Sequence, residues 1–156
     1  MMDKKEICLI AHNIRSLWNV GSLFRTCDAL GVTKLYLTGY TGCPPRKEIT
    51  KTALGAEEFV QWEHYDEPMD VISDLKKEGW QIVCLELSDK SIVLSEFEPK
   101  YPICLILGNE VDGVRDDLLE NCDSVVSIPM MGKKESLNVA VAAGIALYGL
   151  QEKAFV

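Results

Sequence analysis

Polar side chains and glycines gather in three segments of this sequence, and each segment follows a short apolar run. The first runs from Asn13 to Thr26, the second from Leu107 to Val114, and the third from Ile128 to Val139. In an open parallel α/β sheet, ligands bind beyond the carboxyl ends of the strands, where these segments would lie. They are therefore the first candidates for a functional site.

The first segment pairs an amide with a cation. Asn19 is well placed to cap a helix, and Arg25 follows six residues later within that helix. An arginine in an otherwise apolar helix is costly unless its guanidinium has anionic partners, such as a phosphate. A salt-bridged surface arginine explains the same pattern equally well.

The second segment is glycine-rich. Gly108 and Gly113 permit tight turns or a close approach of the backbone to a ligand, and Glu110 between them is a candidate polar anchor. A tight turn between a strand and a helix would also account for this pattern.

The third segment leads into the last helix. Pro129 ends a strand, Gly132 bends the loop, and Ser136 is a candidate N-cap for the helix, which alone would explain the segment. Asn138 suggests more, because an amide in so apolar a helix needs a hydrogen-bond partner.

The composition is that of one globular domain, 1–156, with 47% hydrophobic residues. The net charge of −8 does not favour a nucleic-acid binder, which usually carries a basic face. A local cluster could compensate at one end of the sheet, and its candidate members are Arg15, Arg25, Arg46, Lys47 and Lys51.

The sequence indicates a cytoplasmic protein that does not enter a membrane. No apolar run approaches the roughly 18 residues of a membrane span, and the residues from Met1 to Glu6 lack the apolar stretch of a signal peptide. The six cysteines form no CxxC pair and have no histidine at metal-ligand spacing. We expect reduced, mostly buried thiols rather than disulfides or a zinc site.

Several common sites are disfavoured by missing motifs. No GxGxxG follows the first strand, and neither GxxxxGK[ST] nor GxSxG occurs, so dinucleotide binding, P-loop phosphate binding and a hydrolase nucleophile elbow are disfavoured. His12 lies near the first segment, and we expect a structural role for it.

The elements that would position these segments alternate between strands and helices, which predicts an α/β fold with a mainly parallel sheet and helices on both faces. The expected strands are 7–11, 34–38, 59–62, 80–85, 103–107 and 124–128, and the expected helices are 19–30, 66–77, 116–121 and 137–150. A long loop is expected over 39–50. The last helix is apolar nearly all round, which predicts a partner subunit or a deep position in the fold.

Taken in order, the three segments resemble the signature motifs of the SpoU (TrmH-type) branch of the SPOUT RNA methyltransferases. The matching stretches are NVGSLFRTCDALGV, LILGNEVDGV and SIPMMGKKESLNVAVA. The resemblance implies a C-terminal deep trefoil knot, S-adenosylmethionine as the methyl donor, no metal, and a homodimer, which would explain the apolar last helix.

The resemblance also implies roles for individual residues. The catalytic set would be Asn19, Arg25, Glu110, Ser136 and Asn138, with Arg25 holding an RNA phosphate. The donor pocket would include Leu85, Leu87, Gly108, Ile128, Met130 and Leu137. Apart from the resemblance, the local basic cluster leads us to expect RNA contacts from Arg15, Arg46, Lys47 and Lys51.

The expected activity is methylation of a ribose 2′-hydroxyl in tRNA or rRNA. Two alternatives remain open: a non-catalytic relative that binds RNA or a protein, and methyl transfer to a protein or small molecule. Many relatives carry an extra N-terminal domain or terminal helices that bind RNA. The acidic net charge of this chain leads us to expect an accessory RNA-binding protein.

Overall fold

Seven parallel strands form the frame of the molecule in a computed structural model that describes residues 5–155. The strands are β1 (Ile7–His12), β2 (Lys34–Thr38), β3 (Trp62–Tyr65), β4 (Gln81–Leu85), β5 (Ile92–Val93), β6 (Ile103–Leu107) and β7 (Ser124–Ser127). Their order in the sheet is β3-β2-β1-β6-β4-β7-β5. Every neighbouring pair is parallel, which confirms the predicted sheet type.

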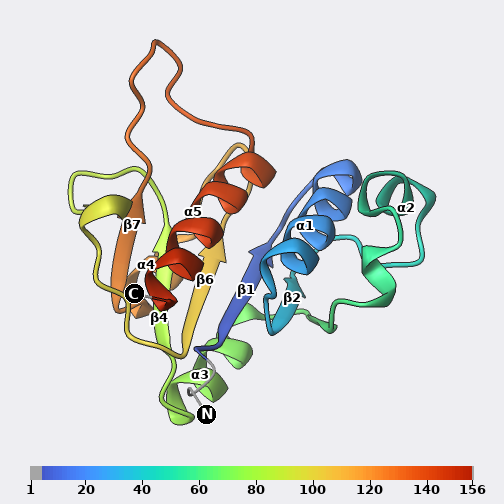
Figure 1. The fold of residues 1–156 in the computed structure, drawn as a ribbon, viewed down its shortest axis with the longest axis horizontal. Helices are drawn as coiled ribbons and strands as arrows, with labels where there is room; N and C mark the ends of the chain where they lie inside the picture. Colours follow the sequence, from blue (N-terminus) through green and yellow to red (C-terminus); the bar gives the residue numbers. More distant parts are fainter. Residues whose placement is uncertain (1–4, 156) are drawn as a thin grey trace.

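Helices cover both faces of this sheet, as predicted. α1 (Leu17–Leu30) and α5 (Val139–Ala154) lie side by side on one face, and α2 (Lys47–Ala53) packs beside α1 (Figure 1). α3 (Pro68–Lys77) and α4 (Asp116–Asn121) belong to the apolar cluster on the other face. Short 3₁₀ turns occur at Ala56–Glu58 and Leu94–Glu96.

The two central strands are continuous apolar runs because both of their faces are covered. All residues of β1 and β6 are buried. Leu9 and Leu105 belong to the cluster under α1 and α5, whereas Ile10 and Ile106 belong to the cluster under α3. Backbone pairing places Leu9 opposite Leu105 and Ile10 opposite Ile106, and this register fixes where the carboxyl ends of the two strands stop.

The first helix begins two residues earlier than predicted. Ser16, and not Asn19, is the N-cap of α1, and its hydroxyl accepts a hydrogen bond from the Asn19 amide nitrogen at 3.2 Å. Gly31, with φ of 66°, ends the helix in the left-handed conformation. The Asn19 side chain is therefore free of capping and faces other partners.

The last helix is capped by Asn138 rather than by Ser136. The Asn138 Oδ1 accepts hydrogen bonds from the amides of Ala140, at 2.9 Å, and Val141, at 3.3 Å. Ser136 lies two residues before this cap, outside the helix. At the other end the helix continues to Ala154, and the Lys153 ammonium donates to the carbonyl of Leu94 at 2.7 Å.

Two predicted segments between β2 and α3 were wrong. The loop expected over 39–50 contains the start of α2, which forms because Ile49 and Ala53 stand one helical turn apart and bury together against α1. The strand expected over 59–62 lies at Trp62–Tyr65, since pairing of Leu35 with Trp62 sets its register. Phe59 is exposed and outside the strand.

The six cysteines all lie within the described residues and form no disulfide, and four of them are buried. Burial raises the pKa of the Cys8 thiol to about 12. Within residues 5–155, no helix is long and apolar enough to cross a membrane. Residues 1–4, on which the interpretation of the N-terminus partly depends, lie outside the described part.

Candidate active site

A cavity of about 530 Å³ opens at the carboxyl ends of β4, β6 and β7. Three loops line it, and these follow the three strands in turn. The structure brings all six predicted donor-pocket residues into this lining: Leu85, Leu87, Gly108, Ile128, Met130 and Leu137. The sheet order makes this meeting possible, because β6, β4 and β7 are neighbours although they are distant in sequence.

The loop after β6 is folded back tightly on itself. The Asn109 amide donates to the Gly113 carbonyl at 3.0 Å, and the Gly113 amide donates to the Asn109 carbonyl at 2.9 Å. A Cβ at Gly108 would lie 2.2 Å from the Gly113 carbonyl carbon, which no real side chain could tolerate. The glycine is therefore required for the close backbone contact that shapes this wall.

Glu86, which was not predicted from the sequence, supports the same wall. Its Oε2 accepts a hydrogen bond from the Val114 amide at 2.7 Å, and the residue lines the cavity. A carboxylate between Leu85 and Leu87, directly after a buried strand, was the signal that could have identified it. Asn109, Asp112 and Glu135 also line the cavity without having been predicted.

A chain of hydrogen bonds joins the three motif segments beside the cavity. The Asn138 side-chain amide donates to Asn19 Oδ1 at 3.2 Å, and the Asn19 side-chain amide donates to Glu110 Oε2 at 3.3 Å. Asn138 thus has the hydrogen-bond partner that was expected for its side-chain amide. These contacts fix the start of α5 against the start of α1 and against the loop after β6.

Glu110 is held as a carboxylate by several donors. Its Oε1 accepts from the Arg15 amide at 2.8 Å, and its Oε2 accepts from the Ser16 amide at 3.0 Å. Burial alone would raise the pKa of this carboxyl, but the donated hydrogen bonds lower it below its ordinary value of 4.5. Glu110 therefore anchors the loops as an anion, rather than serving as a proton donor near neutral pH.

We expect Glu110→Gln to lower the free energy of unfolding at pH 7 by about 1 kcal/mol, because the amide loses a charged acceptor. A lowered folded-state pKa stabilises the protein above the unfolded value, and this contribution is lost as the pH falls through the folded value. The difference between wild type and variant should therefore shrink below pH 4.5. Urea titrations at pH 7 and pH 3.5 measure it, and an equal difference at both pH values would contradict the assignment.

Ser136 lines the cavity and is exposed. No hydrogen bond to its side chain is formed within residues 5–155, so its hydroxyl is available to a ligand. Of the predicted catalytic set, Glu110 and Ser136 line the cavity itself, and Asn19 and Asn138 contact its rim through the hydrogen-bond chain.

Arg25 is separated from this group. Six residues of helix rotate its side chain about 240° from that of Asn19 and move it about 9 Å along the axis. It is exposed and lines a different hollow between α1 and α2, together with Lys51. Among the described residues it forms no ion pair.

The other predicted RNA-contacting residues are all exposed. Lys51 lies 5.7 Å from the centre of the Trp18 ring, and Trp18 directly precedes Asn19. Arg46 and Lys47 lie at the start of α2, one turn before Lys51, and Arg15 precedes α1.

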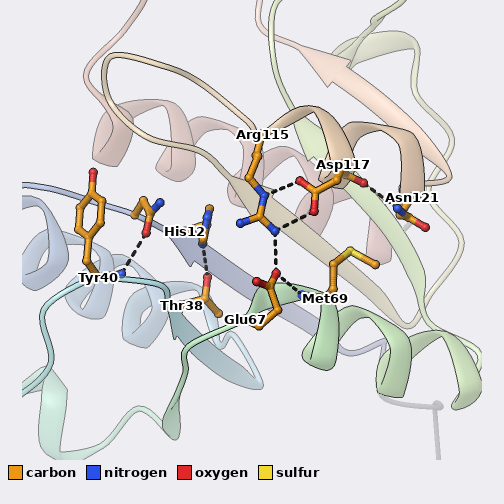
Figure 2. A network of polar contacts seen from close by, with 9 residues as sticks. His12, Thr38, Tyr40, Glu67, Met69, Arg115, Asp117 and Asn121 are labelled. Atoms are coloured by element: carbon orange, nitrogen blue, oxygen red, sulfur yellow. Dashed lines mark hydrogen bonds and ion pairs between the residues drawn. The ribbon is translucent and has the colours of Figure 1, made fainter.

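His12 is buried and does not line the cavity. Its Nδ1 lies 3.0 Å from Thr38 Oγ1, and burial together with the nearby Arg115 charge lowers its pKa. Arg115 binds Glu67 at 2.6 Å and also Asp117, which ties α4 to α3 near this edge of the sheet (Figure 2). These contacts give His12 and Arg115 structural roles.

The cavity has the chemistry to hold a flat ring and a positive charge together. Its size lies within the range of small-molecule sites. Leucine side chains and backbone amides suit a heteroaromatic ring, whereas the carboxylates of Glu86, Asp112 and Glu135 favour a cation. Within residues 5–155 no cluster of three or more metal-ligating side chains occurs.

Comparisons with known proteins agree with this architecture. The family described as SpoU rRNA Methylase matches residues 6–148. The chain is 36% identical over 151 residues to a tRNA (guanosine(18)-2′-O)-methyltransferase of Aquifex aeolicus, covering 96% of this chain and 71% of that protein. It is 33% identical to the enzyme of the same name in Escherichia coli, covering 95% of this chain and 64% of that one.

Solved structures are similar over nearly the whole chain. The SpoU methyltransferase AviRb of Streptomyces viridochromogenes, in complex with the cofactor AdoMet, has a TM-score of 0.88 and 25% identity. The match covers 99% of this chain and 62% of that protein.

Proposed function

Because this chain belongs to the SpoU rRNA methylase family, we infer that it is an RNA methyltransferase that transfers a methyl group from S-adenosylmethionine to a ribose 2′-hydroxyl. tRNA is the first candidate substrate, since the tRNA methyltransferases of Aquifex aeolicus and Escherichia coli are among its similar relatives, and rRNA is the second. The matched residues cover 71% of the length of the first relative and 64% of the length of the second. The proposed activity is therefore assigned to this domain only.

The observation that carries this proposal is the coincidence of cavity and motifs. All six residues expected to hold the donor line one cavity, and four of the five expected catalytic residues lie in it or at its rim. When bound there, S-adenosylmethionine supplies an electrophilic methyl group on a sulfonium cation, which needs no metal. The carboxylates of the lining are suited to that positive charge.

The chain's own residues position the second substrate. A 2′-hydroxyl is a weak nucleophile, and holding it in line with the methyl group is the main task of the site. The free hydroxyl of Ser136 and the amides of Asn19 and Asn138 are suited to orienting a ribose. Arg25 is too basic to act as a general base and lies in a separate hollow, so we assign it to binding an RNA phosphate.

Transfer of a radiolabelled methyl group tests the function directly. Purified protein should label unmodified tRNA transcripts or rRNA, and alkaline hydrolysis should leave a dinucleotide resistant at the methylated ribose. Labelling of protein instead of RNA would support the alternative substrate class. Donor binding in calorimetry without labelling of RNA or protein would contradict the catalytic assignment.

We propose that the protein works as a homodimer through α5. Only one side of this helix is buried within the chain, and a stripe on the other side remains exposed, formed by Val141, Ile145 and Tyr148. Their spacing places them on one face of the helix, and such contiguous apolar surface is typical of an interface.

We expect Ile145→Glu to convert the dimer to a monomer, because the interface would have to bury an unpaired charge. Analytical ultracentrifugation measures the change. Leu54→Glu is the matched control, since Leu54 is 65% exposed at another surface. A wild-type protein that sediments as a monomer would refute the proposed interface.

The basic residues of α2 are proposed to bind RNA backbone. Reversing the charges of Arg46, Lys47 and Lys51 to Glu should raise the Kd for tRNA at least tenfold. It should also reduce the slope of log K against log salt by about 2, at about 0.7 per lost single-strand phosphate contact.

Filter binding between 50 and 200 mM KCl measures both quantities. A matched control reverses Lys76, Lys77 and Lys100, which are exposed near the opposite end of the sheet, with the same change in net charge. Equal losses in the two triple variants would mean that only overall charge matters.

Three further features are proposed from the resemblance and from the net charge. We propose a trefoil knot in the C-terminal third, a single domain over 1–156, and an accessory RNA-binding protein to offset the net charge of −8.

A further inference from the structure

Tyr40 is an exposed aromatic residue that is nevertheless held in place at both ends. It follows β2, and 60% of its surface is exposed. Its backbone amide donates to Asn13 Oδ1 at 3.0 Å, and its hydroxyl accepts from the Asn109 side-chain amide at 2.7 Å. In Figure 2 its ring points away from the Arg115 network.

The backbone at Asn13 and Gly39 holds Tyr40 in this position. Asn13 has a φ of 52°, in the left-handed region that asparagine adopts more readily than most residues other than glycine. A Cβ at Gly39 would lie 2.0 Å from Asn13 Oδ1, so only glycine fits between the two. Such a combination persists only where surrounding contacts determine it, and it is typical of functional sites.

Asn109 connects Tyr40 to the candidate active site. The Asn109 side-chain oxygen accepts from the amides of Val111, at 2.8 Å, and Asp112, at 2.9 Å, and all three residues line the cavity. Glu110, the anchor of the hydrogen-bond chain, is the next residue. The tyrosine ring therefore stands at the rim of the cavity and is attached to the loop that forms its wall.

The exposed ring gains little from the core, so its aromatic character calls for another explanation. RNA proteins commonly stack unpaired bases on exposed aromatic rings, and a ring that is already ordered loses little entropy on binding. Stacking does not require positive charge, which matters in a chain with a net charge of −8. We propose that Tyr40 is the stacking platform for an unpaired RNA base at or next to the methylated nucleotide.

This inference rests on the proposed RNA methyltransferase function, and the test keeps the two apart. Tyr40→Leu removes the ring, Tyr40→Phe keeps the ring but loses the bond to Asn109, and Phe59→Leu is a matched control. Phe59 is 78% exposed and precedes β3, at the opposite end of the sheet. Each protein is tested for donor affinity by calorimetry, for the KM of unmodified tRNA transcripts, and for their Kd by filter binding.

We expect Tyr40→Leu to raise the KM and Kd for tRNA about 5- to 150-fold, which corresponds to the roughly 1–3 kcal/mol lost with one stacked base. The donor affinity should stay unchanged, and Tyr40→Phe and Phe59→Leu should remain within about threefold of wild type. A Tyr40→Leu variant with wild-type tRNA affinity would overturn the inference. So would a Tyr40→Phe variant as weak as Tyr40→Leu, because the hydroxyl bond alone would then explain the residue.

Failure of the proposed function gives a different pattern. In that case wild type would bind no donor and transfer no methyl group, whereas filter binding to tRNA would still compare the ring variants. Loss of tRNA binding in Tyr40→Leu alone would then support the stacking platform in a protein that binds RNA without modifying it.

Discussion

Replacing Arg25 with alanine is expected to lower kcat/KM for methyl transfer to RNA by about 10- to 100-fold, because a charged phosphate contact worth roughly 1.5–3 kcal/mol is lost. The Kd for S-adenosylmethionine should remain within a factor of two, because Arg25 does not line the donor cavity. Its guanidinium is exposed and has no ion-pair partner among the described residues, so folding stability should change little. Single-turnover kinetics and calorimetry measure the two quantities.

Arg25→Lys is the informative companion variant. It keeps the positive charge but loses the planar fork that binds two phosphate oxygens, so we expect a rate between those of wild type and Arg25→Ala. A loss of donor affinity in Arg25→Ala would contradict the separation between the donor cavity and the arginine. A rate equal to that of wild type would show that the phosphate role belongs to another residue.

Replacing Gly108 with alanine is expected to raise the Kd for S-adenosylmethionine about 10- to 100-fold, if roughly the 1–3 kcal/mol cost of overpacking falls on the donor-bound loop. The new Cβ would lie 2.2 Å from the Gly113 carbonyl carbon, and the loop that forms the cavity wall would have to move. Overpacking of this kind also costs about 1–3 kcal/mol of stability. Calorimetry measures the affinity, and thermal unfolding confirms that the variant is folded at the temperature used.

Gly132→Ala is the matched control for this variant. Gly132 belongs to the motif loop before α5, but a Cβ there meets no atom within 4 Å and the residue does not line the cavity. We therefore expect the donor affinity of Gly132→Ala to be close to that of wild type. If Gly108→Ala lost stability but kept its affinity, the loop after β6 would not shape the donor site.

Much of the fold could be predicted because local signals agreed with the tertiary structure. Apolar runs predicted the strands β1 and β6, and Gly31 marked the end of α1. The errors fell where tertiary contacts decide. α2 forms because Ile49 and Ala53 pack against α1, and the position of β3 depends on its pairing with β2.

The first residues of α1 and α5 were predicted less well, for a related reason. Ser16, Asn19, Ser136 and Asn138 are all good capping residues, and sequence offers no way to choose between two candidates a few residues apart. The structure uses Ser16 and Asn138, which leaves the Asn19 side chain for Glu110 and the Ser136 hydroxyl for a ligand.

The amino-acid sequence by itself determined the family, the α/β sheet and the residue types of the candidate site, because these depend on motif order and on periodicity. Only the tertiary structure decided which motif residues lie together and which lie apart. It joins Asn19, Glu110 and Asn138 in one hydrogen-bond chain and turns Arg25 to a separate hollow. It also brings Tyr40 to Asn109, 69 positions away, because parallel strands that are distant in sequence end at the same edge of the sheet.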